Sequence, residues 1–288
     1  GPVKMKMDLG VDVLPKFSKD STDRNRTSPF AFTGNKFEFR MPGSSQNLAD
    51  INTVLNTVVA KELKDFADEL EKAEDFEPAV IALVKRVFHD HRRIIFNGDG
   101  YAHAWEEEAE KRGLLNLKSA PEALPYMASK KNIALMEEFG VLTKTELESR
   151  CEVSLEQYSK LLHIEAVTML EIARKRIVPA INAFMTDTAA AITAKQAACP
   201  GISCRAETKL LQEMSLYSDG ISDGLEALNT AVEEAEAQSS ALAIAQAYHD
   251  KVKAAMEALR SASDKAEAIC GDEYWPLPSY SSMLYYTM

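Results

Sequence analysis

The chain has few cysteines and no long uncharged apolar run, and each shortage excludes a class of protein. Its 288 residues include only four cysteines, at positions 151, 199, 204 and 270, which are too few and too scattered for a disulfide scaffold. No apolar run approaches the 18 residues of a membrane span, and the N-terminus lacks the pattern of a signal peptide. We therefore expect a cytoplasmic protein without a membrane partner.

Basic charge is also scarce. The chain carries 33 Lys and Arg against 44 Asp and Glu, a formal net charge of -11. A nucleic-acid-binding surface needs a concentrated basic stripe, and none is found, so we expect no nucleic-acid partner. The length is sufficient for one large or two small domains with a sizeable core.

Two short patterns suggest metal or redox chemistry but are incomplete. Cys199 and Cys204 are separated by four intervening residues in Cys-Pro-Gly-Ile-Ser-Cys, yet a second ligand pair at metal spacing is absent. We expect reduced thiols in a turn between helices, with a bridge formed by oxidation of a purified sample as the alternative. His89 and His91 would point apart on a helix, so a metal site from this pair alone is not expected.

One short segment before residue 41 contains several ionisable side chains that could bind a metal ion or phosphate. Lys36, Glu38 and Arg40 alternate with Phe37 and Phe39. In a β-strand this period of two places the three ionisable groups on one face and the two rings on the other. The aromatic face is expected to pack on a core, whereas the charged face is suited to water or to a charged ligand.

The turn Thr33-Gly34-Asn35 precedes this strand and predicts an antiparallel hairpin with the segment that contains Asn25 and Arg26. A carboxylate flanked by cations can hold a divalent ion while guanidinium groups bind phosphate oxygens. The alternative is a solvated strand face whose charges pair with each other and contribute little to the stability of the fold. The residues alone leave both interpretations open.

The rest of the chain reads as helical, so the fold class is predicted to be mainly α with a small α+β part. Pro179 should kink the long helix that begins at Ser154, and Gly220 and Gly224 are expected to end the shorter helix that begins at Glu207. The aromatic tail Tyr274–Tyr286 should dock back on the protein, because it is too apolar to remain in water. Apolar spacing and cap residues predict helices over Asn52–Leu70, from Pro78 onward, and over Tyr101–Arg112, Ala120–Ala128, Ser154–Lys195, Glu207–Tyr217 and Leu225–Ile269.

Several motifs, in order, resemble the type III form of glutamine synthetase. The segment Thr22–Arg40, with its Asn-Arg pair and Phe-Glu-Phe-Arg, is similar to the nucleotide-site stretch of that family. The resemblance continues through nearly the whole chain, in Leu55–Ala60, Arg93–Tyr101, Ser119–Glu148 and Tyr274–Tyr280.

The resemblance implies a C-terminal portion of a longer protein. The family's N-terminal β-grasp domain, its paired metal-site glutamates and its Gly-rich segment with a histidine cannot be found here. The opening Gly1-Pro2 is typical of the residues left when a protease removes a tag. A further arginine that the family places after the Asn-Arg pair is also missing, because Ala31 or Phe32 stands there.

The expected organisation follows from the resemblance. Residues 1–24 would be a linker with the tag remnant, and 25–153 the C-terminal part of the catalytic domain with its β-hairpin remnant. Residues 154–270 would form a long antiparallel helical hairpin or bundle, and 271–288 a tail docked on the catalytic part.

The implied activity is ATP-dependent ligation of ammonia to glutamate through a γ-glutamyl phosphate. By position in the motif, Glu38 would be a ligand of Mg²⁺ or Mn²⁺, and Arg40 would stabilise the transferring phosphoryl group. Arg26 and Lys36 would bind the nucleotide. The protein's partners would be glutamate, ammonia and ATP, with a homo-oligomer expected, and the isolated chain would be inactive. The alternative is a non-catalytic helical oligomerisation or interaction module.

Overall fold

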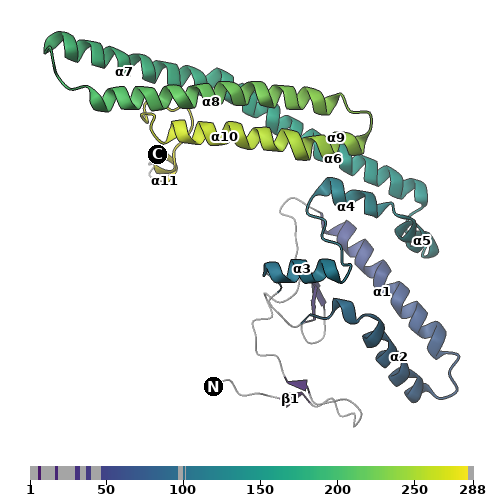
Figure 1. The fold of residues 1–288 in the computed structure, drawn as a ribbon. Helices are drawn as coiled ribbons and strands as arrows, with labels where there is room; N and C mark the ends of the chain where they lie inside the picture. The colour runs from purple at the N-terminus through teal and green to yellow at the C-terminus, as the bar shows by residue number, and fades with distance from the viewer. Residues whose placement is uncertain are drawn as a thin grey trace. The chain divides into compact units, whose positions relative to one another are not determined.

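The computed structural model describes residues 6–7, 17–18, 30–32, 37–39, 47–96, 100 and 102–284. The chain forms two compact units, residues 1–116 and 117–288, and each is described by itself. Both are mainly helical, as predicted (Figure 1). Compact units and functional domains need not coincide, so the expected domain limits, such as 153/154, remain predictions.

The described strands of the first unit are short and pair antiparallel. β1 (Lys6–Met7) pairs with β2 (Phe17–Ser18), and β3 (Phe30–Phe32) pairs with β4 (Phe37–Phe39). The second pair is the predicted hairpin. Its neighbours Asn25, Arg26, Lys36 and Arg40 lie outside the described residues.

Two helices follow the hairpin. α1 (Leu48–Leu70) begins at Asn47, whose side-chain oxygen accepts a hydrogen bond from the Ala49 amide at 2.8 Å. α2 (Phe76–Asp90) contacts α1, and the Arg86 guanidinium donates to both carboxylate oxygens of Glu69 at 2.9 and 2.6 Å. The bidentate geometry aligns the two helices, although both side chains are exposed and the pair adds little stability.

The apolar stripe of α1 is not a core face, contrary to the sequence-based expectation. Val58, Val59 and Leu63 are exposed, and the buried residue of α1 is Thr57, whose hydroxyl donates to the Thr53 carbonyl at 2.7 Å. A helix pair can cover only the sides that face each other, so a wide stripe leaves its remaining apolar positions in solvent.

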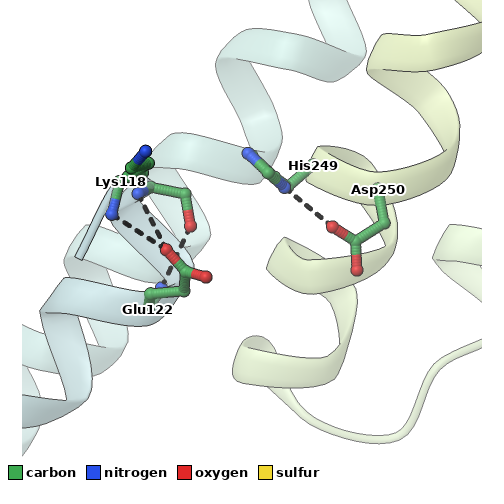
Figure 2. A network of polar contacts seen from close by, with 5 residues as sticks. Lys118, Glu122, His249 and Asp250 are labelled. Atoms are coloured by element: carbon green, nitrogen blue, oxygen red, sulfur yellow. Dashed lines mark hydrogen bonds and ion pairs between the residues drawn. The ribbon is translucent and has the colours of Figure 1, made fainter. Parts of the chain in front are cut away.

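The second unit begins with two short, capped helices. α4 (Ala120–Met127) starts with a capping box, in which the Glu122 carboxylate accepts the backbone amides of Lys118 and Ser119, both at 3.0 Å (Figure 2). α5 (Lys130–Glu138) follows, with Ser129 as its N-cap. These caps satisfy amides that would otherwise lack partners.

The helix predicted to begin at Ser154 starts ten residues earlier, at Lys144. α6 (Lys144–Ile172) is capped by Thr143, which forms a capping box with Glu146. The hydrogen bonds from the Thr143 backbone and hydroxyl hold the pKa of Glu146 below its ordinary value. Ser154 lies inside α6, so its assignment as the first cap was wrong: a complete capping box at Thr143 starts the helix earlier.

A π-helical segment precedes Pro179. η3 (Ala173–Ile177) joins α6 to α7 (Val178–Ala198), and the Val178 amide donates to the Ala173 carbonyl, five residues back. The wider turn keeps Ala173, Ile177 and Ile181 buried at steps of four residues, a spacing that would drift around a regular α-helix. The chain therefore accommodates the proline next to a local widening of the helix.

Gly220 and Gly224 do not end a helix, contrary to the prediction. α8 (Arg205–Glu236) runs through both, because neither position needs a positive φ and a neighbouring helix packs against them. A Cβ added at Gly224 would lie 3.1 Å from the Leu259 Cα, whereas one at Gly220 would lie 3.6 Å from the Ala262 Cβ. The glycines thus permit close helix packing rather than a turn.

The predicted continuous helix Leu225–Ile269 is divided by a turn. α8 ends at Glu236, and Ser240 caps the next helix by accepting the Ala243 amide at 3.2 Å. The chain then returns along α8 through α9 (Ala241–Ala247), the π-helical η4 (Tyr248–Val252) and α10 (Lys253–Glu267). The apparent single seam is therefore the facing sides of two antiparallel helices, which meet in Figure 1.

The main core lies between these long helices. Residues below 2% exposed include Ile181, Met214, Ile221, Leu228, Val252 and Leu259. A second, smaller cluster joins α4, α6 and α9 around Cys151, Leu155 and Ala245. Burial of such side chains supplies about 1.5–3 kcal/mol each relative to exposure, which explains the stability of the unit better than its surface ion pairs do.

The aromatic tail docks on the helical unit. Tyr274, Trp275 and Leu277 pack against the main core, and the Tyr274 hydroxyl donates to Asp187 on α7 at 2.6 Å. The Tyr274 ring meets Phe184 edge-on at 5.4 Å. The prediction that the tail docks on the catalytic part is wrong for these residues, because their polar and aromatic partners are on α7. A short helix, α11 (Tyr280–Leu284), follows.

One helix passes a simple length-and-hydropathy test for a membrane span. The continuous run Lys144–Ala198 contains an 18-residue stretch with mean hydropathy 1.2, of which 11% is buried. The run contains charged residues, so it is not an uncharged apolar run of the kind sought in the sequence, and small residues such as alanine raise its average hydropathy. The mostly buried core helices of soluble proteins pass the same test.

The two glycines of α8 provide a matched prediction. Gly224→Ala should destabilise the chain by about 1–3 kcal/mol, since its Cβ meets helix backbone that cannot move alone. Gly220→Ala has room and should stabilise by roughly 0.5–1 kcal/mol through helix propensity. Urea unfolding monitored by circular dichroism measures both. Equal effects of the two substitutions would contradict the close packing at Gly224.

The Tyr274–Asp187 hydrogen bond predicts a pH limit for tail docking. The bond and nearby carboxylate raise the pKa of Tyr274 to about 12. Because the folded pKa exceeds the ordinary value near 10, the contact is fully present below pH 10 and is lost as pH rises through about 12.

Fluorescence in a Trp105→Phe background, where Trp275 is the remaining tryptophan, can follow this loss. Tyr274→Phe should give a red-shifted emission already at pH 8, whereas the control Tyr217→Phe should not. An unchanged emission in Tyr274→Phe would show that the hydrogen bond does not hold the tail.

Candidate functional site

Glu38 is the one sequence-predicted site residue that lies within the described chain. It sits in the middle of β4, where its backbone pairs with Ala31 of β3. Its side chain is half-buried, whereas Phe39 is 40% exposed. Of these two side chains the charged one is the more covered, which is the reverse of the expected order. Of the predicted group Arg26, Lys36, Glu38 and Arg40, only Glu38 lies within the described residues, so the grouping stays a prediction.

The chemistry available at Glu38 is that of a partly covered carboxylate. Such an oxygen donor suits a hard divalent cation. Within the described residues, no group of three His, Cys, Asp or Glu side chains could hold a metal ion. Glu38 fits a metal site as one ligand among several, and further ligands would have to come from elsewhere.

A cluster of aromatic and arginine side chains lies in the connection between α2 and α3 (His103–Lys111). Phe96 and Trp105 stack with their ring centroids 4.1 Å apart. The Arg112 guanidinium lies 6.0 Å from the Phe96 centroid and 5.7 Å from that of Trp105, within cation–π range. The segment Arg93–Tyr101 was recognised as a motif in the sequence, but its contacts with Arg112 were not. Those contacts form only because α3 brings Arg112 back beside the segment.

The same arginine ties the connection together through hydrogen bonds. Its Nε donates to Glu108 at 2.6 Å, and one terminal nitrogen donates to the carbonyls of Arg93 at 3.2 Å and Ile95 at 2.9 Å. A cavity of about 570 Å³ opens beside it. The 3₁₀ helix η2 (Arg92–Ile94) forms one side of this cavity.

A second recess, of about 560 Å³, lies between α6, the end of α8 and η4. His163 Nδ1 is 2.9 Å from the Tyr248 hydroxyl and 3.3 Å from a Glu236 carboxylate oxygen. Burial, and then the charge of Glu236, raise the pKa of Tyr248. These polar groups already satisfy one another, so the contact works as a link between three helical segments.

The histidine next to this link has a different partner. His249 Nδ1 lies 2.7 Å from a carboxylate oxygen of its neighbour Asp250, and Figure 2 shows this pair. Both residues belong to the π-helical segment. π-Helical turns are frequent at functional sites, but this pair is local to one turn and forms no wider cluster with the capping box of α4.

All four cysteines are thiols in the structure. Cys151 is buried and donates to the Leu124 carbonyl at 3.3 Å, and burial raises the pKa of both Cys151 and Cys270. Neither is therefore an activated nucleophile. Cys199 is exposed and Cys204 is buried, on either side of the turn between α7 and α8 as predicted.

Comparison with known proteins identifies the family. The profile of the glutamine synthetase C-terminal domain matches residues 79–196. The type-3 glutamine synthetase of Dictyostelium discoideum is 46% identical over 189 residues, which cover 65% of this chain and 26% of that protein.

Two bacterial relatives give the same result. A glutamine synthetase of Butyrivibrio fibrisolvens is 37% identical over 283 residues, or 93% of this chain and 39% of that protein. A glutamine synthetase of Bacteroides fragilis is 38% identical over 180 residues, or 61% of this chain and 25% of that protein. The chain thus spans at most about two fifths of the length of these relatives. On this similarity, which extends over nearly all of its residues, the chain belongs to the type 3 glutamine synthetases.

Proposed function

We propose that the protein to which this chain belongs joins ammonia to the side-chain carboxylate of glutamate in a reaction driven by ATP hydrolysis. The observation that carries the proposal is the 37% identity over 93% of the chain to a glutamine synthetase. The β3–β4 hairpin supports it, since Phe37–Phe39 of the predicted nucleotide-site motif form a strand paired with Phe30–Phe32. The γ-phosphoryl group of ATP would pass to glutamate, and ammonia would attack the acyl phosphate.

Four residues of the hairpin segment are proposed for this reaction. Glu38 would be one ligand of Mg²⁺ or Mn²⁺, and the metal, when bound, would neutralise phosphate charge. Arg40 would stabilise the transferring phosphoryl group, and Arg26 and Lys36 would bind the nucleotide. Cations fixed in place suit this role, because the transferred group is anionic throughout and no reorganisation is needed in the transition state.

The half-buried position of Glu38 supports its proposed role. Partial exclusion of water strengthens the interaction between a carboxylate and a cation. Its cross-strand neighbour is Ala31, one of the two residues at the place where the family carries a further arginine. A methyl group cannot bind phosphate, so that function would fall to another residue.

The second unit would act as a scaffold in a homo-oligomeric cytoplasmic enzyme. Its core is independent of the hairpin. A second candidate function, a non-catalytic oligomerisation or interaction module, is favoured by the exposed apolar residues of α6, which are Val153, Leu161, Ile164 and Val167. Such a stripe on a long helix is typical of a contact surface.

The chain alone is predicted to form no glutamine. It spans 39% of the Butyrivibrio relative, and the paired metal-site glutamates and the histidine segment of the family are not found in it. A single carboxylate leaves a magnesium ion short of ligands. A coupled assay of ADP release with glutamate, ammonia and ATP should therefore match a blank without protein. Turnover clearly above that blank would contradict the prediction.

In the complete protein, Glu38→Ala and Arg40→Ala should each lower kcat by about 10²-fold or more, the scale for loss of one preorganised electrostatic contact. Arg260→Ala is the control, because Arg260 is an exposed residue of α10 that pairs with Asp264 within its own helix. It should leave kcat unchanged. Near-normal turnover in both hairpin variants would show that the site lies elsewhere.

A further inference from the structure

The cavity between η2 and the end of α3 has an unusual concentration of positive charge. Five residues line it: Phe88, Arg92, Arg93, Ile95 and Arg112. Three of these five residues are arginines, around one space of about 570 Å³, in a chain whose formal net charge is -11. No acidic residue is among the five that line the cavity.

Arg112 is the fixed member of the three. The Glu108 carboxylate, two backbone carbonyls and two aromatic rings hold its guanidinium. These contacts use Nε and one terminal nitrogen, which leaves the second terminal nitrogen with donors to spare. A cation held in this way loses little side-chain entropy when it binds a ligand.

Arg92 and Arg93 carry charge that the described chain does not neutralise. Both lie in η2 and are exposed. Over the described residues, neither guanidinium has a hydrogen bond or an ion pair. Glu108 compensates only Arg112, with which it is paired at 2.6 Å. The Asp90 carboxylate, two residues before Arg92 in the sequence, contacts His89, and the Glu69 carboxylate is paired with Arg86.

We propose that this cavity binds the phosphate group of a small anionic molecule. A guanidinium presents paired donors that match phosphate oxygens, and three such groups around one space suit a tetrahedral anion better than a single planar carboxylate. Phe88 and Ile95, both exposed apolar side chains, give the cavity an apolar wall. The ligand is therefore either a simple inorganic phosphate or one attached to a flat organic group.

None of the five residues that line this cavity belongs to the hairpin segment, and the inference does not rest on the proposed function. Its arginines come from η2 and the C-cap of α3, whereas the nucleotide residues proposed above are Arg26, Lys36 and Arg40. An anion could bind at either place, so the experiment must tell them apart.

Isothermal titration of the chain with inorganic pyrophosphate, at low ionic strength and with EDTA, tests the proposal. EDTA removes divalent ions on which binding at the hairpin would depend. We expect saturable binding with one site. Arg92→Gln combined with Arg93→Gln should weaken it by about tenfold or more, because two charge-assisted contacts are removed. Arg112 is left intact, since it also holds the local backbone.

Two matched double variants decide the location. Arg26→Gln with Arg40→Gln should leave pyrophosphate affinity unchanged, and so should Arg174→Gln with Arg176→Gln, which removes the same charge from η3. If the hairpin variant abolishes binding while the Arg92 and Arg93 variant does not, the proposal is overturned. Equal weakening by all three, or no saturable binding to the unaltered chain, would reduce the effect to non-specific attraction and overturn it too.

Adenosine monophosphate then distinguishes the two kinds of ligand. If it binds more tightly than inorganic phosphate and Phe88→Ala removes the gain, the ligand carries a flat ring that packs on Phe88. If the two bind equally and Phe88→Ala has no effect, the cavity takes the phosphate group alone. Circular dichroism of each variant ensures that a loss of binding is not a loss of fold.

Discussion

The close approach of α8 and α10 is the constraint on which the helical unit depends. At Gly224 the two helices are so near that a methyl group would meet the Leu259 backbone. That proximity lets Ile221, Leu228 and Leu259 interdigitate with almost no exposed surface. α7 packs on the other side of α8, and the tail packs on α7. A wider α8–α10 spacing would leave voids that side chains of this size could not fill, at a cost that grows with cavity volume.

Hydrogen-bonding side chains, rather than apolar spacing, determine where several of the helices begin. Thr143 and Glu146 start α6, Ser119 and Glu122 start α4, and Ser240 starts α9. Apolar periodicity continues smoothly across such points. This is why the sequence analysis found the helical regions but began one helix at Ser154 and ran another through the turn before Ser240.

The hairpin and the helical character were predictable, because strand alternation and helical spacing are local properties of the chain. The α8 glycines were misread, since a glycine that breaks a helix and one that admits a neighbour look alike until the neighbour is known. The arginine cavity was not predictable either. Arg92 and Arg93 were visible as charges, but their meeting with Arg112 depends on the path from α2 to α3. Of the hairpin residues proposed for catalysis, the structure describes Glu38 alone.

The two π-helical segments, η3 and η4, bear on where residues can be inserted or deleted during the evolution of this chain. A π turn holds one more residue than the α turn it replaces, and the helix continues on both sides of it. η3 and η4 are thus places where a single residue can be gained or lost without breaking a helix or shifting a loop. We expect alignments with related chains to need one-residue gaps inside these otherwise uninterrupted helices, and a gapless alignment there would pair buried positions with exposed ones.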